Sequence, residues 1–364
     1  MTGFHQLSVA RVEPLTGQAC AVHFEVPAEL REEYRFTPGQ HLTLRRRSAD
    51  GANPGTAGED RRTYSICSTP QELTDSGTMR IGVKRITNGV FSNWLTGELL
   101  SGGTVEVMTP AGRFGTPVAA GNARHVGCLA AGSGITPVLS IVASVLSTEP
   151  ASRVTLVYGN RTSNDVMFLE ELADLKDQYP DRFTLLHVLS AEPQLSDLLT
   201  GRIDEQKIEL LLDGLCKDVD QWYLCGPIGM VTAARAALQG GGVPASAVHV
   251  ELFYVGDEPP VPVAVSTAHA ATDRSAVTVT LSGRTSTVAV PYAGPSILDA
   301  VLASRPDAPY ACKGGVCGTC RAVVTAGSVT MTRNYALEPE ELDAGVVLAC
   351  QSHPETAEVS LQFQ

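Results

Sequence analysis

Short segments of alternating apolar and polar residues fill the first third of the chain. Six of them lie between residues 6 and 116: QLSVARV, ACAVHFEV, QHLTLRRR, RTYSICS, TMRIGVKR and TVEVMTP. A period of two is typical of a strand with one buried face, and six such segments with turn residues between them predict an antiparallel β-barrel. We expect one helix in this region, at about 92–100, and a mobile hairpin tip over the glycine- and acid-rich stretch 48–60.

The pattern changes after Gly121. The apolar segments HVGCLAAG, RVTLVYG, FTLLHVL, QWYLCG and AVHVELF now alternate with stretches of helical period such as MFLEELADLKDQY and IGMVTAARAALQ. Strands that alternate with helices indicate a parallel, doubly wound α/β sheet. We therefore expect a second domain over residues 117–254.

A proline-containing stretch follows, VGDEPPVPVAVSTAHAATDRS, which has no helical period and is expected to be a linker over 255–275. The remaining residues, 276–364, contain a predicted hairpin (AVTVTL and TSTVAV), a helix opened by Ser296 and a loop rich in cysteine. This arrangement suits a small α+β domain of the β-grasp type. The fold class is thus multi-domain, with a barrel over 1–116, an α/β domain and a third, smaller domain.

Composition narrows the classes of function. The net charge of −12 argues against nucleic-acid binding and against docking on an anionic membrane through a basic patch. No apolar run reaches the about 18 residues needed to span a bilayer, and the N-terminal segment lacks the pattern of a signal peptide. Nine cysteines, an odd number, indicate reduced thiols rather than disulfides, and so the cytosol.

The cysteines of the third domain have the C-x4-C-x2-C…C spacing of a plant-type [2Fe–2S] site. The expected iron ligands are Cys312, Cys317, Cys320 and Cys350. Glycines between the first three would let the loop wrap closely, with backbone N–H groups aimed at the sulfurs. Zinc is the alternative, but zinc sites usually present thiols as two close sequence pairs, and here there is one pair with two outliers.

The barrel contains two short elements suited to a flavin. RTYS begins a predicted strand, where the Arg62 guanidinium suits a pyrophosphate, Tyr64 could stack on the flavin ring and Ser65 could hydrogen-bond flavin N5. GVFS, residues 89–92, opens the predicted helix, whose N-terminus is a second pyrophosphate site. Taken alone, each element is weak evidence, and a plain strand with a buried tyrosine is the more common explanation. The two elements together, in this order and ahead of a nucleotide-binding pattern, indicate a flavin site.

Elements of the second domain are suited to a nicotinamide nucleotide. AAGSGITP follows its first strand, and its glycines allow close approach of a phosphate, with Thr136 as the expected helix N-cap; a tight structural turn is the alternative. In YGNR, Arg161 lies where a ribose 2′-phosphate would bind, which favours NADPH, although NADH stays open and a solvated arginine is the alternative. CGPIGM and HVELF end two further strands, where Cys225 could equally be a buried strand residue.

These motifs resemble those of the ferredoxin–NADP reductase superfamily, through R-x-Y-S and G-x-x-S, and of plant-type ferredoxins over about 275–364. The resemblance implies FAD, with FMN the less favoured option, and NAD(P)H. The residues expected to bind these cofactors are Arg62, Tyr64, Ser65, Val83, Lys84, Gly89, Val90, Phe91, Ser92, Gly132, Gly134, Thr136, Asn160, Arg161, Gly226, Pro227 and Phe253. Catalytic roles are expected for Ser65, Cys225 and Glu251.

The order of the parts resembles the reductases of multicomponent bacterial oxygenases. Phrases such as AAGSGITPVLSIVASVL, ACKGGVCGTCRA, NYALEPEEL and VVLACQSHP are similar to the reductase subunits of phenylacetyl-CoA epoxidases. The resemblance implies that electrons pass from NADPH through flavin and cluster to a di-iron oxygenase that epoxidises phenylacetyl-CoA. Reductases of 3-ketosteroid 9α-hydroxylases are the closest rival, and an iron–sulfur redox sensor without turnover is the alternative of another class.

Overall fold

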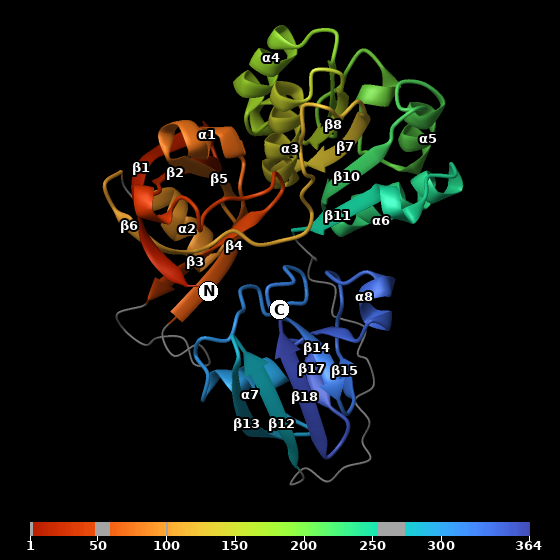
Figure 1. The fold of residues 1–364 in the computed structure, drawn as a ribbon. Coiled ribbons are helices and arrows are strands. Elements are labelled where there is room, and N and C mark those ends of the chain that lie inside the picture. The colour runs from red at the N-terminus through yellow and green to blue at the C-terminus, as the bar shows by residue number, and fades with distance from the viewer. Residues whose placement is uncertain (1–2, 48–58, 100, 254–273) are drawn as a thin grey trace. The chain divides into compact units, whose positions relative to one another are not determined.

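The structure is a computed structural model that describes residues 3–47, 59–99, 101–253 and 274–364. The hairpin tip expected over 48–60 and the linker expected over 255–275 lie almost entirely outside the described residues. The chain divides into two compact units, Phe4–Gly256 and Asp257–Gln364 with Met1–Gly3, and each unit is considered by itself (Figure 1). No helix in the described ranges combines the length and apolar character needed to cross a membrane.

Six antiparallel strands form the first domain of the larger unit, as predicted. They are β1 (Phe4–Thr16), β2 (Ala19–Glu25), β3 (His41–Arg47), β4 (Glu59–Ser65), β5 (Thr78–Lys84) and β6 (Thr104–Met108). Their order is β4-β3-β6-β1-β2-β5. An antiparallel bridge between Ile66, just after β4, and Ile81 of β5 joins the two ends of the sheet and closes the barrel around an apolar interior.

The described part of the barrel carries two α-helices where one helix was expected. The expected helix is α2 (Val90–Gly97), which begins two residues before the predicted start. The additional helix is α1 (Pro70–Ser76), whose sequence does contain a helix start signal. Thr69 and Glu72 form a capping box, and Pro70 occupies the first turn, where a missing N–H costs nothing.

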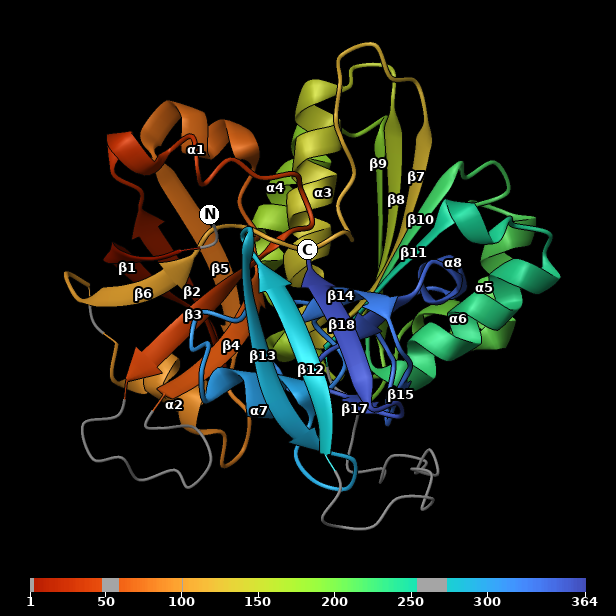
Figure 2. The same ribbon diagram turned by 60° about the horizontal axis from the view of Figure 1, so that its bottom comes forward.

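The second domain has the expected parallel sheet. Its strands are β7 (His125–Ala131), β8 (Arg153–Asn160), β9 (Phe183–Leu189), β10 (Gln221–Gly226) and β11 (Val248–Leu252), in the order β11-β10-β7-β8-β9. Helices α3 (Ile135–Thr148) and α4 (Leu169–Gln178) cover one face, and α5 (Glu205–Asp213) and α6 (Ile228–Gly240) cover the other (Figure 2). The three central strands, β7, β8 and β10, are buried on both faces, which explains their nearly continuous apolar sequence.

A glycine sets the distance between the barrel and the nucleotide domain. Gly82 of β5 faces Thr136 at the start of α3 and the ring of Phe168, which precedes α4. A Cβ atom at position 82 would collide with the Thr136 methyl group and lie 3.1 Å from the Phe168 ring. The close packing of the two domains therefore depends on the missing side chain.

Polar contacts cross the same interface. Arg80 of β5 forms a two-pronged ion pair with Glu171 of α4, with N–O distances of 2.8 and 2.6 Å. The same guanidinium donates to the Cys67 carbonyl, and the buried Ser140 hydroxyl of α3 donates to the Ser68 carbonyl at 2.7 Å. The segment after β4 is thus bonded directly to the nucleotide domain.

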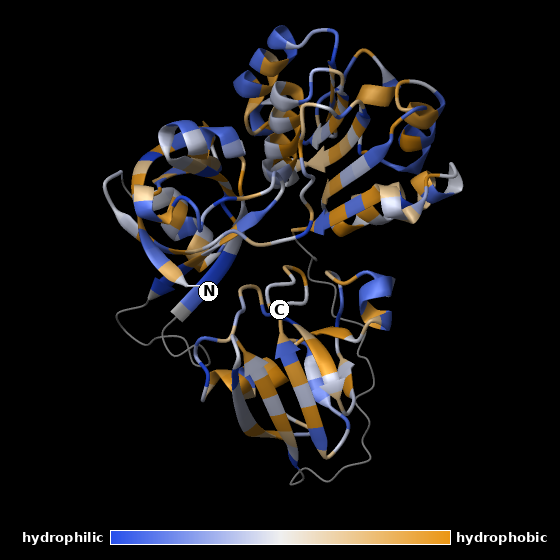
Figure 3. Ribbon diagram, viewed as in Figure 1, coloured by the Kyte–Doolittle hydropathy of each residue, from blue (hydrophilic) through white to orange (hydrophobic). Residues whose placement is uncertain are grey.

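The smaller unit has the expected α+β architecture. Its strands are β12 (Arg274–Leu281), β13 (Arg284–Pro291), β14 (Arg321–Ala326), β15 (Val329–Met331), β16 (Val346–Leu348), β17 (Ser352–Pro354) and β18 (Glu358–Phe363), with helices α7 (Ile297–Leu302) and α8 (Pro339–Asp343). The main sheet has the order β13-β12-β18-β14-β16, in which β12 and β18 run parallel. Alternating colours along β12 and β18 show one face turned to the core (Figure 3).

Candidate functional site

A cavity of about 750 Å³ lies at the carboxyl ends of the parallel strands, where open α/β sheets bind their ligands. Eight of the residues that we expected to bind cofactors line it: Lys84, Gly132, Gly134, Asn160, Arg161, Gly226, Pro227 and Phe253. Lys84 comes from the barrel and the others from the nucleotide domain. The predicted elements, which are spread over 170 positions of sequence from 84 to 253, therefore meet in one hollow.

The turn after β7 brings the backbone close to this cavity. Gly132 has φ of +54°, which favours glycine, and a Cβ atom at Gly134 would collide with the Cys225 carbonyl of β10. The predicted N-cap at Thr136 is wrong, because α3 already begins at Ile135 and Gly134 is the capping residue. The Thr136 hydroxyl donates to the Ser133 carbonyl and does not line the cavity. α3 has no side-chain cap, but the Ile135 amide already donates to the Gly132 and Ser133 carbonyls, so a phosphate would depend mainly on the glycine turn itself.

Two arginines of the cavity have no acidic partner in the described ranges. They are Arg161, which was predicted, and Arg202, which was not. The two carboxylates that line the same cavity are used by their own loops: Asp165 accepts from Thr162 at 2.8 Å, and Asp204 caps α5. With Lys84, the cavity lining has three cationic and two anionic side chains, an excess of one positive charge, which suits a phosphate group. Arg202 was missed because its loop, between β9 and α5, carries no recognised motif.

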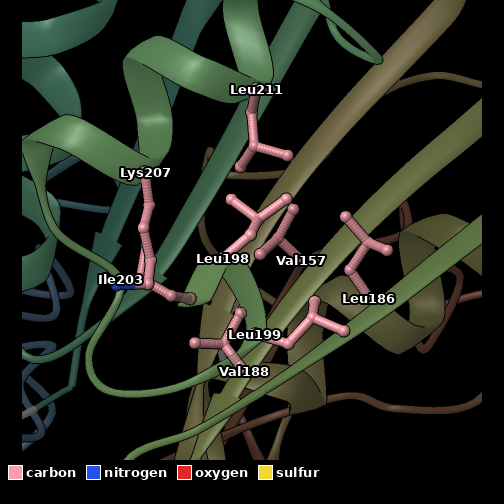
Figure 4. A pocket seen from close by; sticks show the side chains of 8 residues that line it. All are labelled: Val157, Leu186, Val188, Leu198, Leu199, Ile203, Lys207 and Leu211. Atoms are coloured by element: carbon pink, nitrogen blue, oxygen red, sulfur yellow. The ribbon is translucent and has the colours of Figure 1, made fainter. Parts of the chain in front are cut away.

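A second hollow lies beside the first, and the two share Val188 and Ile203. Figure 4 shows aliphatic side chains turned toward one another, with the stem of Lys207 alongside. The space has no room for a water molecule. It is therefore part of the apolar packing beneath the nucleotide cavity and not a ligand site.

The flavin elements lie together on the barrel. Tyr64 of β4 and Phe91 of α2 have ring centroids 6.1 Å apart, and Phe91 packs edge-on against Trp94 at 5.3 Å. Gly89 precedes α2 and offers no side chain to cap it, so the amides of the first turn are available, as at the pyrophosphate sites of other helices. Val83, by contrast, is fully buried in the barrel core, so only its backbone can reach a ligand.

Ser65 and Glu251 make contact between the two domains. The Ser65 hydroxyl at the end of β4 donates to the Glu251 carboxylate of β11 at 3.0 Å. His41 pairs with Ser65 in the β3–β4 ladder, and its Nδ1 lies 3.7 Å from the same carboxylate. Cys225 is fully buried next to Glu251 in the parallel pairing, and burial raises the pKa of its thiol, so it stays protonated. The side chains of Ser65, Glu251 and His41 together can hold and orient a proton. The sequence analysis did not identify His41.

The four predicted iron ligands form two pairs in the smaller unit. Cys312 and Cys317 lie within hydrogen-bonding distance of each other, and so do Cys320 and Cys350. The Cys317 thiol, and then backbone N–H groups, lower the pKa of Cys312 to about 5, and Gly314 N donates to its sulfur at 3.3 Å. The Cys320 thiol likewise lowers the pKa of Cys350. The thiolate form, which binds metal, is thus stabilised at Cys312 and Cys350, whereas the same pairing raises the pKa of Cys317 and Cys320.

The pairing fits a [2Fe–2S] centre better than a single ion. Within the described ranges, no three His, Cys, Asp or Glu side chains converge as the ligands of one metal ion would. A two-iron cluster needs two thiolates on each iron, which is the arrangement of Cys312 with Cys317 and of Cys320 with Cys350. Gly315 and Gly318 have φ of +77° and +66°, so the loop bends at positions where other residues would be strained.

Known families match each of the three parts. Residues 6–115 match an oxidoreductase FAD-binding domain, residues 128–236 an oxidoreductase NAD-binding domain, and residues 279–355 a 2Fe-2S iron–sulfur cluster binding domain. The FAD-binding match supports FAD over FMN as the flavin. The expected cofactor set is thereby confirmed at the level of FAD, a nicotinamide nucleotide and a [2Fe–2S] cluster.

Relatives match along the full length. The chain is 45% identical to one component of the 1,2-phenylacetyl-CoA epoxidase of Escherichia coli K12, over 100% of this chain and 98% of that protein. It is 35% identical to the ferredoxin reductase component of 3-ketosteroid-9-alpha-monooxygenase of Rhodococcus rhodochrous, over 98% and 96%. Phthalate dioxygenase reductase has the same fold, with a TM-score of 0.58 at 21% identity over 99% and 98% of the two chains. The chain belongs to the family of oxygenase reductases that combine FAD-binding, NAD-binding and plant-type [2Fe–2S] domains.

Proposed function

We propose that this protein is the reductase component of a phenylacetyl-CoA epoxidase. It would take electrons from NADPH and pass them through FAD and the [2Fe–2S] cluster to a di-iron oxygenase. The observation that carries the redox part is the Ser65–Glu251 hydrogen bond. It joins β4, which bears the predicted flavin residues, to β11, the edge strand of the sheet whose carboxyl end holds a cavity with room for a nucleotide. The 45% identity over the full chain supports the pathway.

When bound, FAD would supply the conversion of a two-electron hydride transfer into the one-electron steps that a [2Fe–2S] centre requires. The protein's own part is to bind, orient and hold protons. Ser65 would present its hydroxyl to the flavin ring, and Glu251 would hold that hydroxyl in place and exchange its proton. Phe253 lies two residues after Glu251 and lines the cavity, where it would cover the bound nicotinamide.

Preference for NADPH is part of the proposal. Arg161 and Arg202 supply two guanidiniums to the cavity, and with Lys84 the cationic side chains of its lining outnumber the two carboxylates. A ribose 2′-phosphate would meet both charges, whereas the 2′-hydroxyl of NADH would gain little from them.

The test compares kcat/KM for NADPH and NADH, with ferricyanide as acceptor. We expect Arg161→Ala and Arg202→Ala each to lower kcat/KM for NADPH by about tenfold, or about 1.4 kcal/mol, and to leave NADH nearly unchanged. Lys217→Ala is the matched control, since it removes an exposed cation of the same domain that does not line the cavity. An unaltered NADPH-to-NADH ratio in both arginine variants would remove the argument for a 2′-phosphate.

The partner is tested by reconstitution. The protein, NADPH and either a di-iron phenylacetyl-CoA epoxidase or a 3-ketosteroid oxygenase are mixed, and oxygenated product is measured with each. We expect coupled product with the epoxidase. Product with the steroid oxygenase alone would replace the proposal by the rival that the 35% identical relative suggests.

A third outcome separates the enzyme from a redox sensor. If the protein with bound FAD and iron fails to reduce ferricyanide or cytochrome c with either nucleotide, turnover itself is refuted. The proposal also includes a cytosolic location, in which unoxidised thiols remain available as iron ligands.

A further inference from the structure

The side-chain amide of Gln351 lies between the last cysteine ligand and the loop that carries the first. Gln351 is only 7% exposed. Its Nε2 donates to the Lys313 carbonyl at 2.9 Å, to the Cys350 carbonyl at 3.1 Å and to the Cys350 sulfur at 3.5 Å. One amide thus joins two segments that are 38 positions apart in the sequence.

The other end of the amide is also fixed. Gln351 Oε1 accepts from the Thr332 hydroxyl at 2.8 Å, and the Gln351 carbonyl accepts from Thr332 N at 2.9 Å. Backbone carbonyls can only accept, so the NH2 end must face Lys313 and Cys350. The orientation that brings an N–H group to the sulfur is therefore dictated by its partners.

The loop contacted by Gln351 is held in an unusual conformation. Lys313 has φ of +50°, a left-handed value that non-glycine residues rarely adopt. Its side chain is anchored to Asp299 of α7 at 2.8 Å and lies over the Tyr310 ring. A Cβ atom at Gly315 would lie 3.2 Å from Gln351 Cγ, so the glycine also lets the loop close over the glutamine stem.

Hydrogen bonds to cluster sulfurs raise the reduction potential, because an added electron increases the negative charge on sulfur and so strengthens each N–H···S contact. We propose that Gln351 is a positioning residue that sets the reduction potential of the cluster, through its N–H contact with Cys350 and its hold on the Lys313 carbonyl. Its effect is local to the ferredoxin-type domain and independent of which oxygenase accepts the electrons.

The test is Gln351→Met, which keeps the length of the side chain and removes both its donors and its acceptor. The potential is measured by equilibrium dye titration of the full-length protein with its cofactors, and the reduced cluster is examined by electron paramagnetic resonance. We expect the equilibrium constant for one-electron reduction to fall about tenfold, equivalent to about 59 mV, with altered g-values. Thr332→Val is the matched control, because it removes the contact with Oε1 and leaves the donors; a change below about twofold is expected.

Gln351→Glu is the second variant, which keeps the shape of the side chain and the acceptor for Thr332 but loses the donors when ionised. We expect its potential to change in the same direction, and it decides the question if the methionine variant does not fold. Loss of iron from both folded variants that keep FAD would show a purely structural role for Gln351 and would overturn the proposal, because no potential could then be assigned to its N–H contact. Unchanged potential and g-values in the folded glutamate or methionine variant would overturn it. Failure to support any oxygenase leaves this measurement unaffected, so the two proposals fail separately.

Discussion

The Arg80–Glu171 ion pair should contribute measurably to the stability of the larger unit, and Glu171→Gln tests it. The wild-type pair makes two N–H···O bonds across the domain interface, with Arg80 12% and Glu171 34% exposed. An amide has the same shape but one acceptor, so one guanidinium donor would face an NH2 group. Exposed ion pairs contribute about 0–1 kcal/mol, and removing one partner of a buried pair costs about 3–5 kcal/mol. For this partly buried pair we expect a loss of about 2 kcal/mol in the free energy of unfolding.

The assay is thermal unfolding of the full-length protein with FAD, followed by flavin fluorescence. A loss of about 2 kcal/mol corresponds to a decrease of about 4–8 °C in Tm for a unit of this size. Glu170→Gln is the matched control, because it makes the same charge change at the neighbouring, exposed position of α4. Equal Tm values for the two variants would refute the claim that the pairing, rather than net charge, stabilises the interface.

Three further predictions concern the electron path and the pH dependence. Cys317→Ser should leave ferricyanide reduction by NADPH within about twofold of wild type and abolish electron delivery through the cluster; equal loss of both would contradict separate exit routes. Glu251→Gln should slow flavin reduction by NADPH about 10²-fold in stopped-flow measurements, and a rate like that of wild type would exclude a role in holding the Ser65 proton. Burial alone would raise the pKa of Glu149, but hydrogen bonds from Arg124 and neighbouring groups outweigh it and lower the pKa below 4.5. This stability is therefore present above pH 4.5 and lost as pH falls through the lower folded value, so Glu149→Gln should lower Tm at pH 7 and show less further loss between pH 5 and 3.

Local sequence signals were enough to predict the strands of the first two domains, the thiol spacing and eight of the residues that line the nucleotide cavity. The period of two marked the barrel strands, and glycines at strand ends marked the turns that approach the ligand. Errors occurred where two local signals competed. Thr136 looked like an N-cap because threonine precedes proline there, yet the N-cap is Gly134, which packs closely against β10, so the helix starts two residues earlier.

Other functional residues were beyond reach because their partners are distant in the sequence. Nothing near His41 reveals that it will lie beside Glu251, 210 positions later. A binding role for Arg202 becomes apparent only from the cavity, which is lined by residues from several separate segments of the chain. Gln351 follows a recognised cysteine, but its contact with Lys313 exists only once the loop has folded back. Such residues are found through tertiary contacts, which a single sequence does not display.

The missing side chain at Gly82 limits which barrel and nucleotide domains can be combined in a chimaera of this protein. The modular order of oxygenase reductases suggests domain exchange, in which another nucleotide domain is joined to the barrel at a compatible junction in the chain. Here the barrel and the nucleotide domain pack closely because Gly82 has no Cβ atom where it meets the Thr136 methyl group and the Phe168 ring. A transplanted barrel with alanine at that position would push the incoming module away from the flavin, so chimaeras should exchange these three positions as one set.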